Sequence, residues 1–488
     1  MINSLIFYLV LLVYIAFILV RIFRWLAVIQ QKEYRLDRFL TFFKSKEGKK
    51  DFFRLFPLKE LMNMRSIKRP VRTLRVMMFF SLNLFFLIFP FIIFNRHLYI
   101  LIFLTLYYLL IPFVFLCLSL LTDIVKKIIE FFLLSKARAI IQKGKPIIVG
   151  ITGSYGKTIS KELISQVLSK KYSVFKTPQS FNTPISVALS IIKSYKGQKI
   201  AVIEYAAYKR GEIKRIAKFI KPDVAVITGI SDQHLALFGN IQNLIKAKSE
   251  LVLALPKGST VFCGSEDSKT MKVCNSRSDI KIIKCNDLIK ENKIENITLN
   301  KNYYLEFKYK KELVTTKLFG KHYIDAIKNS ITLGNYFKID HRKILVALKN
   351  YSSKENMTIS INTNSKGSLL INDRRSSNSK GFKSAIELAD EINSKKKNEF
   401  EETVLITQGI VDLGEESKSI HKEIALKARE VFSKVYYLGF DGDEEFKNIF
   451  NEDFVNDVNQ IKNRLANSGK SLYLLEGKLH KWVYDLLL

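Results

Sequence analysis

The sequence of 488 residues lacks the features of a small secreted domain and those of a disordered chain. It has only four cysteines, and no two of them form a CxxC pair. A disulfide framework is therefore excluded, and the thiols are expected to be reduced. With 48% hydrophobic and 25% charged residues, the chain is neither disordered nor collagen-like. Its length predicts two or three domains.

Acidic residues are also scarce, because 45 Asp and Glu stand against 78 Lys and Arg, a formal net charge of +33. Such a charge can indicate nucleic-acid binding, but the basic residues are spread along the whole chain and no RRM, zinc-finger or KH pattern occurs. Attraction to anionic lipid explains the charge equally well. We therefore expect membrane lipids, and no nucleic acid, among the partners.

Three stretches contain no charged residue, at residues 2–20, 76–94 and 98–122. A helix needs about 20 apolar residues to cross the hydrocarbon core of a bilayer, so each stretch is long enough. The first lacks a basic n-region and a small-residue cleavage site, which favours an anchor over a cleaved signal peptide. The sequence predicts a membrane-anchored protein with three N-terminal transmembrane helices in a membrane region at 1–135.

Basic residues set the expected orientation of these spans. They are frequent between residues 21 and 75, whereas the joint between the second and third spans holds only Arg96 and His97. By the positive-inside rule, residues 21–75 are cytoplasmic and the joint lies outside. We therefore expect a multi-pass protein of the cell (inner) membrane whose chain beyond about residue 124 is cytoplasmic.

From residue 145 onward, apolar runs of strand length alternate with helical patterns. Strands are expected at 146–152, 200–205, 223–230 and 260–263, and helices at 157–170, 210–220 and 240–254. A second run has strands near 368–372, 402–407, 434–438 and 471–475, and helices near 380–393 and 417–431. This alternation predicts an α/β fold with mainly parallel sheets, in domains at 140–350 and 355–488. The Ser-, Asn-, Thr- and Lys-rich stretch 350–367 is expected to be a linker.

The strongest local signal follows the first of these strands, where residues 147–158 read IIVGITGSYGKT. In such a loop, glycines let backbone N–H groups approach phosphate oxygens, a lysine supplies positive charge and a threonine hydroxyl can bind Mg²⁺. The helix that follows adds its N-terminal dipole. The spacing departs from the strict Walker pattern, because Ile151 takes the place of the first glycine. The expected nucleotide-binding residues are Gly153, Ser154, Tyr155, Gly156, Lys157 and Thr158.

A second group of chemically active residues follows later strands. Glu204 ends one strand, His234 follows the next, and Lys248 lies on the helix after that. In an open parallel sheet, ligands bind at the carboxyl ends of the strands, so these residues and the loop are expected to converge. A carboxylate and an imidazole beside a triphosphate suit Mg²⁺. An ordinary loop histidine and a solvated surface lysine explain His234 and Lys248 equally well.

In their chain order, these segments resemble the Mur ligase family, and within it the MurF-type ligases, which join D-alanyl-D-alanine to UDP-N-acetylmuramoyl-tripeptide. The resemblance covers roughly residues 145–488. The segments that carry it are TGSYGKT (152–158), TPQSFNTPI (177–185), Glu204 with GEI (211–213), ISDQHLALFG (230–239), KAKSE (246–250), and QGIVDLGEES (408–417) with His421. It implies a P-loop-type ATPase domain with a parallel sheet, followed by a Rossmann-like C-terminal α/β domain.

The resemblance also implies an ATP-dependent peptide ligase of peptidoglycan precursor synthesis. ATP would phosphorylate a substrate carboxylate to an acyl-phosphate, which an incoming amine would attack. Thr158 and Glu204 would bind one Mg²⁺, and His234 and a carbamylated Lys248 would serve a second. The implied catalytic residues are Lys157, His234 and Lys248, and the implied substrate-binding residues are Asn182, Thr183, Asp373 and Asn378. The substrates would be a UDP- or lipid-linked cell-wall precursor and an amino-acid or dipeptide amine.

Some segments depart from the family pattern. Residues 322–326 read HYIDA where the family has HNxxN, which leaves the preferred nucleotide base open. Residues 372–379 read NDRRSSNS where MurF-type ligases have DDxYNANP. The membrane region stands where the family has a UDP-binding domain, so the acceptor is left as UDP- or lipid-linked. Two alternatives remain: a membrane-anchored ligase for another polymer, such as poly-γ-glutamate, and a scaffold with a degenerate nucleotide site.

Overall fold

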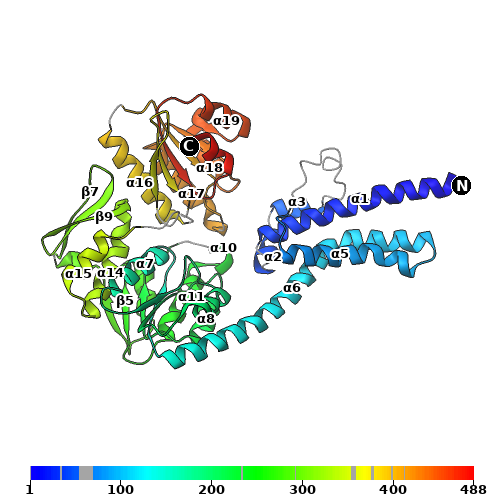
Figure 1. Ribbon diagram of the computed structural model, residues 1–488. Helices are drawn as coiled ribbons and strands as arrows, with labels where there is room; N and C mark the ends of the chain where they lie inside the picture. Colours follow the sequence, from blue (N-terminus) through cyan, green and yellow to red (C-terminus); the bar gives the residue numbers. More distant parts are fainter. Residues whose placement is uncertain are drawn as a thin grey trace. The chain divides into compact units, whose positions relative to one another are not determined.

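The computed structural model describes residues 2–32, 34, 36–44, 46–53, 70–231, 235–291, 293–352, 359–374, 378–396, 399–411 and 413–487. By its internal contacts the chain divides into two units, residues 1–131 and 132–488. The first unit is helical, and the second contains the sheets (Figure 1).

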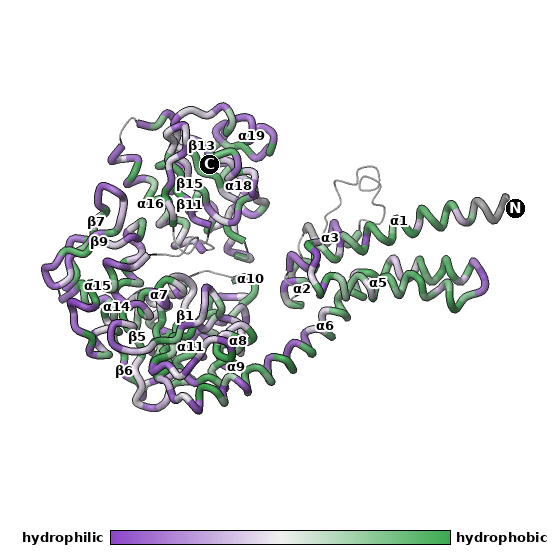
Figure 2. The backbone as a smooth tube through the Cα atoms, in the orientation of Figure 1, coloured by the Kyte–Doolittle hydropathy of each residue, from purple (hydrophilic) through white to green (hydrophobic). Residues whose placement is uncertain are grey.

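The N-terminal unit is built from apolar helices. It contains α1 (Ile2–Gln31), α2 (Leu36–Lys44), α3 (Lys46–Phe53), α5 (Leu74–Ile93) and the first part of α6 (His97–Gly144). Among the described residues, α1 from Phe7, α5 and α6 are long and apolar enough to cross a membrane, by length and composition. Figure 2 shows α1, α5 and the first part of α6 as mostly hydrophobic.

Two of these helices extend beyond the predicted spans. Helix α1 continues past residue 20 to Gln31, and α6 continues past residue 122 to Gly144. Charged side chains end a hydrophobic span, but they do not end a helix, because they disturb no backbone hydrogen bond. Buried polar contacts join the helices, since the Tyr107 hydroxyl of α6 donates to Asn83 Oδ1 of α5 at 2.8 Å.

The central domain contains a parallel sheet with strand order β2-β3-β1-β4-β5-β6. The strands are β1 (Ile147–Thr152), β2 (Val174–Lys176), β3 (Ile200–Glu204), β4 (Val224–Ile227), β5 (Thr260–Cys263) and β6 (Lys281–Lys284). Strands β3, β4 and β5 are buried along their whole length, as expected for a sheet with helices on both faces. The predicted α/β fold with parallel sheets is therefore confirmed.

Helices cover the two faces of this sheet. One hydrophobic core joins the strands to α7 (Lys157–Leu168), α14 (Ile324–Tyr336) and α15 (His341–Lys349). The other joins them to the end of α6, α8 (Pro184–Ser194), α9 (Glu212–Phe219), α11 (Ile241–Leu253) and α12 (Ser268–Cys274). The carboxyl ends of β1, β3 and β4 therefore meet at one edge of a doubly covered sheet, where ligands bind in such folds.

A second, antiparallel sheet was not predicted. It contains β7 (Ile294–Leu299), β8 (Tyr304–Tyr309) and β9 (Glu312–Phe319) in sequential order. Lys310 and Lys311 both have positive φ, at 48° and 69°, in the tight turn between β8 and β9. Positive φ at both central residues favours Asn-Gly or Asp-Gly, so a Lys-Lys turn carries no recognisable hairpin signal in the sequence.

The C-terminal domain has a sheet with strand order β10-β11-β15-β12-β13-β14. Its strands are β10 (Ser360–Thr363), β11 (Leu369–Asp373), β12 (Glu402–Thr407), β13 (Lys434–Tyr437), β14 (Phe454–Val455) and β15 (Ser471–Glu476). The helices are α16 (Ser379–Lys395), α17 (Ser417–Arg429), α18 (Asp443–Phe450), α19 (Val458–Ala466) and α20 (Lys481–Leu487). All pairs are parallel except β10 with β11.

The predicted linker at 350–367 is wrong in part, because β10 lies within it. Strand β10 pairs with β11 along one edge of the sheet, with Ser360 opposite Asn372. An edge strand keeps solvent-facing positions, so a polar composition suits it as well as it suits a linker. Residues 353–358 of the predicted linker lie outside the described residues.

Candidate nucleotide site

A glycine-rich loop joins β1 to α7 and is packed against the end of β4. Gly156, with φ of +72°, adopts a left-handed conformation as the residue before α7. A Cβ atom on Gly153 would lie 2.1 Å from Thr228 Oγ1, so only glycine fits there. The Ser154 N–H donates to the Gly229 carbonyl at 2.7 Å. The loop is thus held in place before any ligand arrives, with a helix N-terminus at its end.

The ammonium of Lys157 lies against the same loop. Its Nζ donates to the carbonyls of Gly153 at 2.8 Å and of Ser154 at 3.1 Å. Burial lowers the pKa of Lys157, and the carboxylate of Glu204 opposes that shift. A cation held against loop carbonyls can exchange these weak partners for phosphate oxygens, which form stronger, charge-assisted hydrogen bonds.

Glu204, at the end of β3, is the centre of a buried polar network. Glu204 is only 1% exposed. Oε2 accepts from the Thr158 hydroxyl at 3.0 Å, and Oε1 accepts from the Asn182 amide at 2.9 Å. The structure therefore brings together three residues that the sequence analysis selected from separate segments.

Lys161 belongs to this network although the sequence analysis did not select it. Its side chain is fully buried, and its Nζ lies 3.5 Å from Glu204 Oε2. The same nitrogen donates to the Gln179 carbonyl. Lys161 is four residues after Lys157 and therefore lies on the same face of α7, which is a signal that the sequence did contain.

The oxygen atoms at this point fit a magnesium ion that is shared with phosphates. Mg²⁺ prefers oxygen ligands and in nucleotide sites takes only one or two from the protein, the rest coming from phosphates and water. The Thr158 hydroxyl and the Glu204 carboxylate provide two such atoms in contact with each other. Within the described part of the chain, no group of three or more His, Cys, Asp or Glu side chains could enclose a metal ion. The described side chains alone therefore do not form a complete coordination shell there.

Lys248 is buried in the middle of α11 and is not the solvated surface lysine of the alternative explanation. The residue is 3% exposed, and its Nζ lies 6.0 Å from the ring centroid of Phe238. Burial, and next the positive charge of Lys157, lower the pKa of Lys248 to about 7. A lysine with this pKa is partly neutral at physiological pH, and only the neutral amine reacts with carbon dioxide to form a carbamate. His234 lies outside the described residues.

The other predicted substrate-binding residues have defined structural positions. Thr183 caps α8, where its hydroxyl accepts from the Ser186 N–H at 3.4 Å. Asn378 caps α16, where its Oδ1 accepts from the Gly381 N–H at 2.9 Å. Asp373 is buried at the end of β11. A role for these residues in substrate binding stays a prediction.

A lysine of the C-terminal domain contacts the glycine-rich loop. Lys380, in the first turn of α16, donates from Nζ to the Tyr155 hydroxyl at 2.8 Å and lies 3.4 Å from Asp325 Oδ2. The same Nζ lies 4.3 Å from the centroid of the Tyr155 ring. The sequence analysis missed Lys380. No motif in the neighbouring sequence identifies this lysine, because its contact joins residues that are 225 positions apart.

A glycine-rich loop at the end of β1 and a buried carboxylate at the end of the adjacent strand are typical of the nucleotide-binding class of α/β proteins. Residues 151–332 match the family model described as Mur ligase middle domain. Residues 151–332 therefore match the family that the sequence motifs predicted for this part of the chain.

The sequence relatives of the chain include peptidoglycan precursor ligases by name. The chain is 26% identical over 292 residues to the UDP-N-acetylmuramoyl-tripeptide–D-alanyl-D-alanine ligase of Bacillus subtilis, covering 59% of this chain and 61% of that one. It is 26% identical over 308 residues to the ligase of the same name from Borreliella burgdorferi, covering 62% and 63%. The chain thus matches less than two thirds of the length of these relatives.

Among solved structures, MurF from Acinetobacter baumannii has a TM-score of 0.62 at 17% identity, covering 73% of this chain and 80% of that one. MurF from Thermotoga maritima in complex with ADP has a TM-score of 0.58 at 24% identity, covering 72% and 80%. These likenesses confirm the fold.

A separate feature of the C-terminal domain makes its stability depend on pH. Glu476 is buried at the end of β15, where Oε2 accepts from the Thr407 hydroxyl at 2.9 Å and Oε1 has no hydrogen-bond partner among the described residues. Burial, and next the charge of Asp373, raise the pKa of Glu476 well above its usual value. The folded state therefore holds a proton that the unfolded state releases above about pH 4.3.

This proton gives the sign of a testable effect. Protonated Glu476 contributes its full share to the free energy of unfolding at pH values below the pKa that this residue has in the unfolded chain. That contribution is lost as the pH rises through the higher pKa of the folded state. Glu476→Gln imitates the protonated form, so we expect the variant to unfold at a higher temperature than wild type at pH 8 and at the same temperature near pH 4.5. Thermal unfolding across this range measures the difference. Exposed Glu452→Gln is the control, and equal melting of Glu476→Gln and wild type at pH 8 would contradict the expectation.

Proposed function

We propose that the chain is an ATP-dependent carboxylate–amine ligase of peptidoglycan precursor synthesis, which adds D-alanyl-D-alanine or a similar amine. The observation that carries the proposal is the buried network of Thr158, Asn182 and Glu204 beside the glycine-rich loop. The names of the relatives and the ADP in the Thermotoga maritima structure support it.

In this proposal, the loop from Gly153 to Thr158 holds the phosphates of ATP. Its backbone N–H groups, the α7 N-terminus and Lys157 supply positive potential where negative charge develops during phosphoryl transfer. Asn182 orients the Glu204 carboxylate toward the loop. Lys161 places a positive charge 3.5 Å from that buried carboxylate, which offsets part of the cost of burying its negative charge.

Thr158 and Glu204 would hold one Mg²⁺, and His234 with a carbamylated Lys248 would serve a second. When bound, the ions neutralise phosphate charge and orient the phosphate groups. Carbamylation converts the Lys248 amine into an anionic oxygen ligand, and the lowered pKa of this lysine provides the neutral amine that the conversion requires. Lys157, His234 and Lys248 are thus the proposed catalytic residues.

The reaction forms an amide bond in two steps. A substrate carboxylate oxygen attacks the γ-phosphorus of ATP, and ADP leaves to give an acyl-phosphate. The amine nitrogen then attacks the acyl carbon, phosphate leaves, and the nitrogen loses a proton. Thr183, Asp373 and Asn378 are proposed to position the substrates, together with Asn182. The contact of Lys380 with Tyr155 supports a C-terminal domain that closes over the loop and excludes water.

The proposed organisation is a membrane region at 1–135, an ATP-binding domain at 140–350 and a C-terminal domain at 355–488. Three apolar helices support anchoring in the cell membrane. The basic residues between 21 and 75 support a cytoplasmic position for the catalytic domains. ATP is present on that side of the membrane, as the reaction requires.

Ligation by the full-length chain tests the proposal. Purified protein is incubated with Mg²⁺-ATP, labelled D-alanyl-D-alanine and a muramoyl-tripeptide acceptor that is either UDP-linked or lipid-linked. We expect labelled acceptor and one phosphate released per amide formed with at least one of the two. If both acceptors stay unlabelled over a panel of amino acids and dipeptides while ATP is present, the ligase proposal fails.

A further inference from the structure

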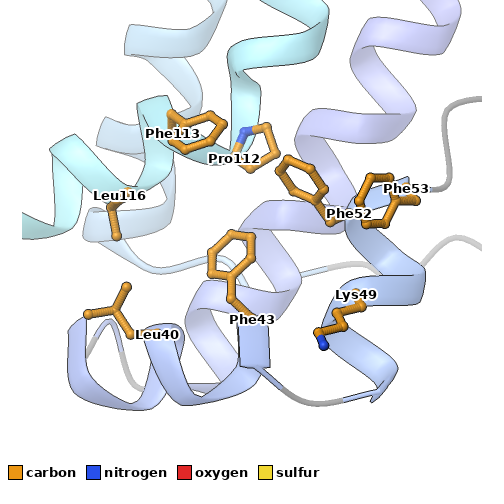
Figure 3. A pocket seen from close by; sticks show the side chains of 8 residues that line it. All are labelled: Leu40, Phe43, Lys49, Phe52, Phe53, Pro112, Phe113 and Leu116. Carbon is orange, nitrogen blue, oxygen red and sulfur yellow. The ribbon is translucent and has the colours of Figure 1, made fainter.

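A cavity of about 300 Å³ lies within the N-terminal unit, between α2, α3 and the middle of α6 (Figure 3). Its walls are apolar and largely aromatic, and one cationic side chain lines it. The lining residues that matter for binding are Leu40, Phe43, Lys49, Phe52, Phe113 and Leu116. A cavity of this kind differs from the polar site around Glu204 and takes a different class of ligand.

The walls of the cavity are held in place by contacts with neighbouring helices. The ring of Phe52 meets those of Phe43 and Phe113 edge to face, with centroids 5.9 Å and 6.0 Å apart. Phe43 in turn stacks on Trp25 of α1 at 5.3 Å. An ion pair between Arg24 and Asp51 ties α3 to α1. The described walls of the cavity are therefore formed by side chains that pack against one another.

A proline of helix α6 lines the cavity. Pro112 lies inside the helix and lines the cavity. A proline within a helix lacks the N–H that would bond to the preceding turn, and its ring displaces that turn. Such an irregularity in an apolar helix is tolerated where neighbouring elements or a ligand cover it.

The charge of the lining favours an anionic ligand, because Lys49 is cationic and no acidic side chain is among the lining residues that the structure describes. In the sequence, residues 21–75 contain 16 basic and 5 acidic residues, a net charge of +11. Lys49 lines the cavity and is exposed, so its ammonium stays hydrated until an anion replaces the water. An apolar cavity with a cation at one side matches an amphiphile that has a hydrocarbon chain and an anionic head.

We propose that this cavity binds the hydrocarbon chain of a phosphorylated long-chain lipid, with Lys49 facing the phosphate, and that such a lipid carries the acceptor carboxylate of the ligase. The second half of this statement rests on the proposed function. A nucleotide-linked sugar does not suit the cavity, because its polar groups would lose water against walls that offer few hydrogen-bond partners. Binding of both lipid and ATP by one chain raises the effective concentration of acceptor at the enzyme.

Lipid binding by the full-length protein tests the proposal. Wild type in phosphatidylcholine nanodiscs is titrated with a polyprenyl phosphate, and bound lipid is counted by native mass spectrometry. Leu116→Trp fills the cavity and is expected to weaken binding at least tenfold, whereas Leu110→Trp, on an exposed face of the same helix, is its matched control. Lys49→Gln is expected to weaken binding about fivefold, and Lys50→Gln, the exposed neighbour outside the lining, is its control.

Each outcome decides the proposal. Unchanged binding by Leu116→Trp, with an unfolding temperature equal to wild type, overturns it, and so does equal competition by phosphatidylglycerol, which would mark the cavity as a site for bulk lipid. Lys157→Ala should bind the lipid as wild type does. Lipid binding without any ligation would refute the ligase function and leave the cavity assignment standing, whereas ligation of the UDP-linked acceptor alone would refute the substrate assignment.

Discussion

Lys157→Ala is expected to lower Mg²⁺-ATP-dependent phosphate release by about 10²- to 10³-fold, the usual cost of removing one preorganised charge at a reacting centre. Among the described residues, the Lys157 ammonium donates to two carbonyls of its own loop and forms no ion pair, so its replacement removes a cation without breaking a described ion pair. Phosphate release by the full-length chain, measured at saturating ATP and acceptor, gives the fold-change.

Two comparisons make this result specific. Lys193→Ala removes an exposed lysine from the last turn of α8 and should retain wild-type activity. ATP binding measured by calorimetry should weaken in Lys157→Ala and remain unchanged in the control. Equal phosphate release by wild type and Lys157→Ala would favour the alternative of a scaffold with a degenerate nucleotide site.

Lys248→Ala is expected to reduce ligation by about 10²-fold, which is the upper range for disturbing the residues that tune a metal site. Its physical basis is the burial that lowers the pKa of Lys248 to about 7 and so makes a neutral, carbamylatable amine available. If the carbamate is the working group, a small carboxylate can replace it, and added acetate or formate should restore part of the activity of the variant.

Dependence on bicarbonate and pH separates carbamylation from a purely structural role. Wild-type activity should rise with added bicarbonate and should fall below about pH 7, where the amine becomes protonated and unreactive. Lys246→Ala, which removes an exposed lysine two residues away on α11, should match wild type in both respects. Bicarbonate independence together with no carboxylate rescue would contradict the carbamate.

The regular part of the fold could be read from the pattern of apolar residues, and the errors have definable causes. Strands β5 and β12 begin and end at the predicted residues, because apolar runs with clear ends mark buried strand segments. The antiparallel strands β7, β8 and β9 escaped notice since their hairpin turn uses two lysines. Strand β10 was assigned to a linker because edge strands and linkers share a polar composition.

Local signals were enough to identify the glycine-rich loop and its lysine, because the backbone freedom of glycine and the charge of lysine act within a few residues of one another. Contacts between distant segments were beyond local signals. Glu204 meets Thr158 and Asn182 across 46 and 22 residues, and Lys380 meets Tyr155 across 225. The burial of Lys248, and with it the lowered pKa, likewise depends on what packs around α11. Burial and long-range contacts arise only when the whole chain has folded, whereas the residues that give the loop its chemistry are consecutive in the sequence.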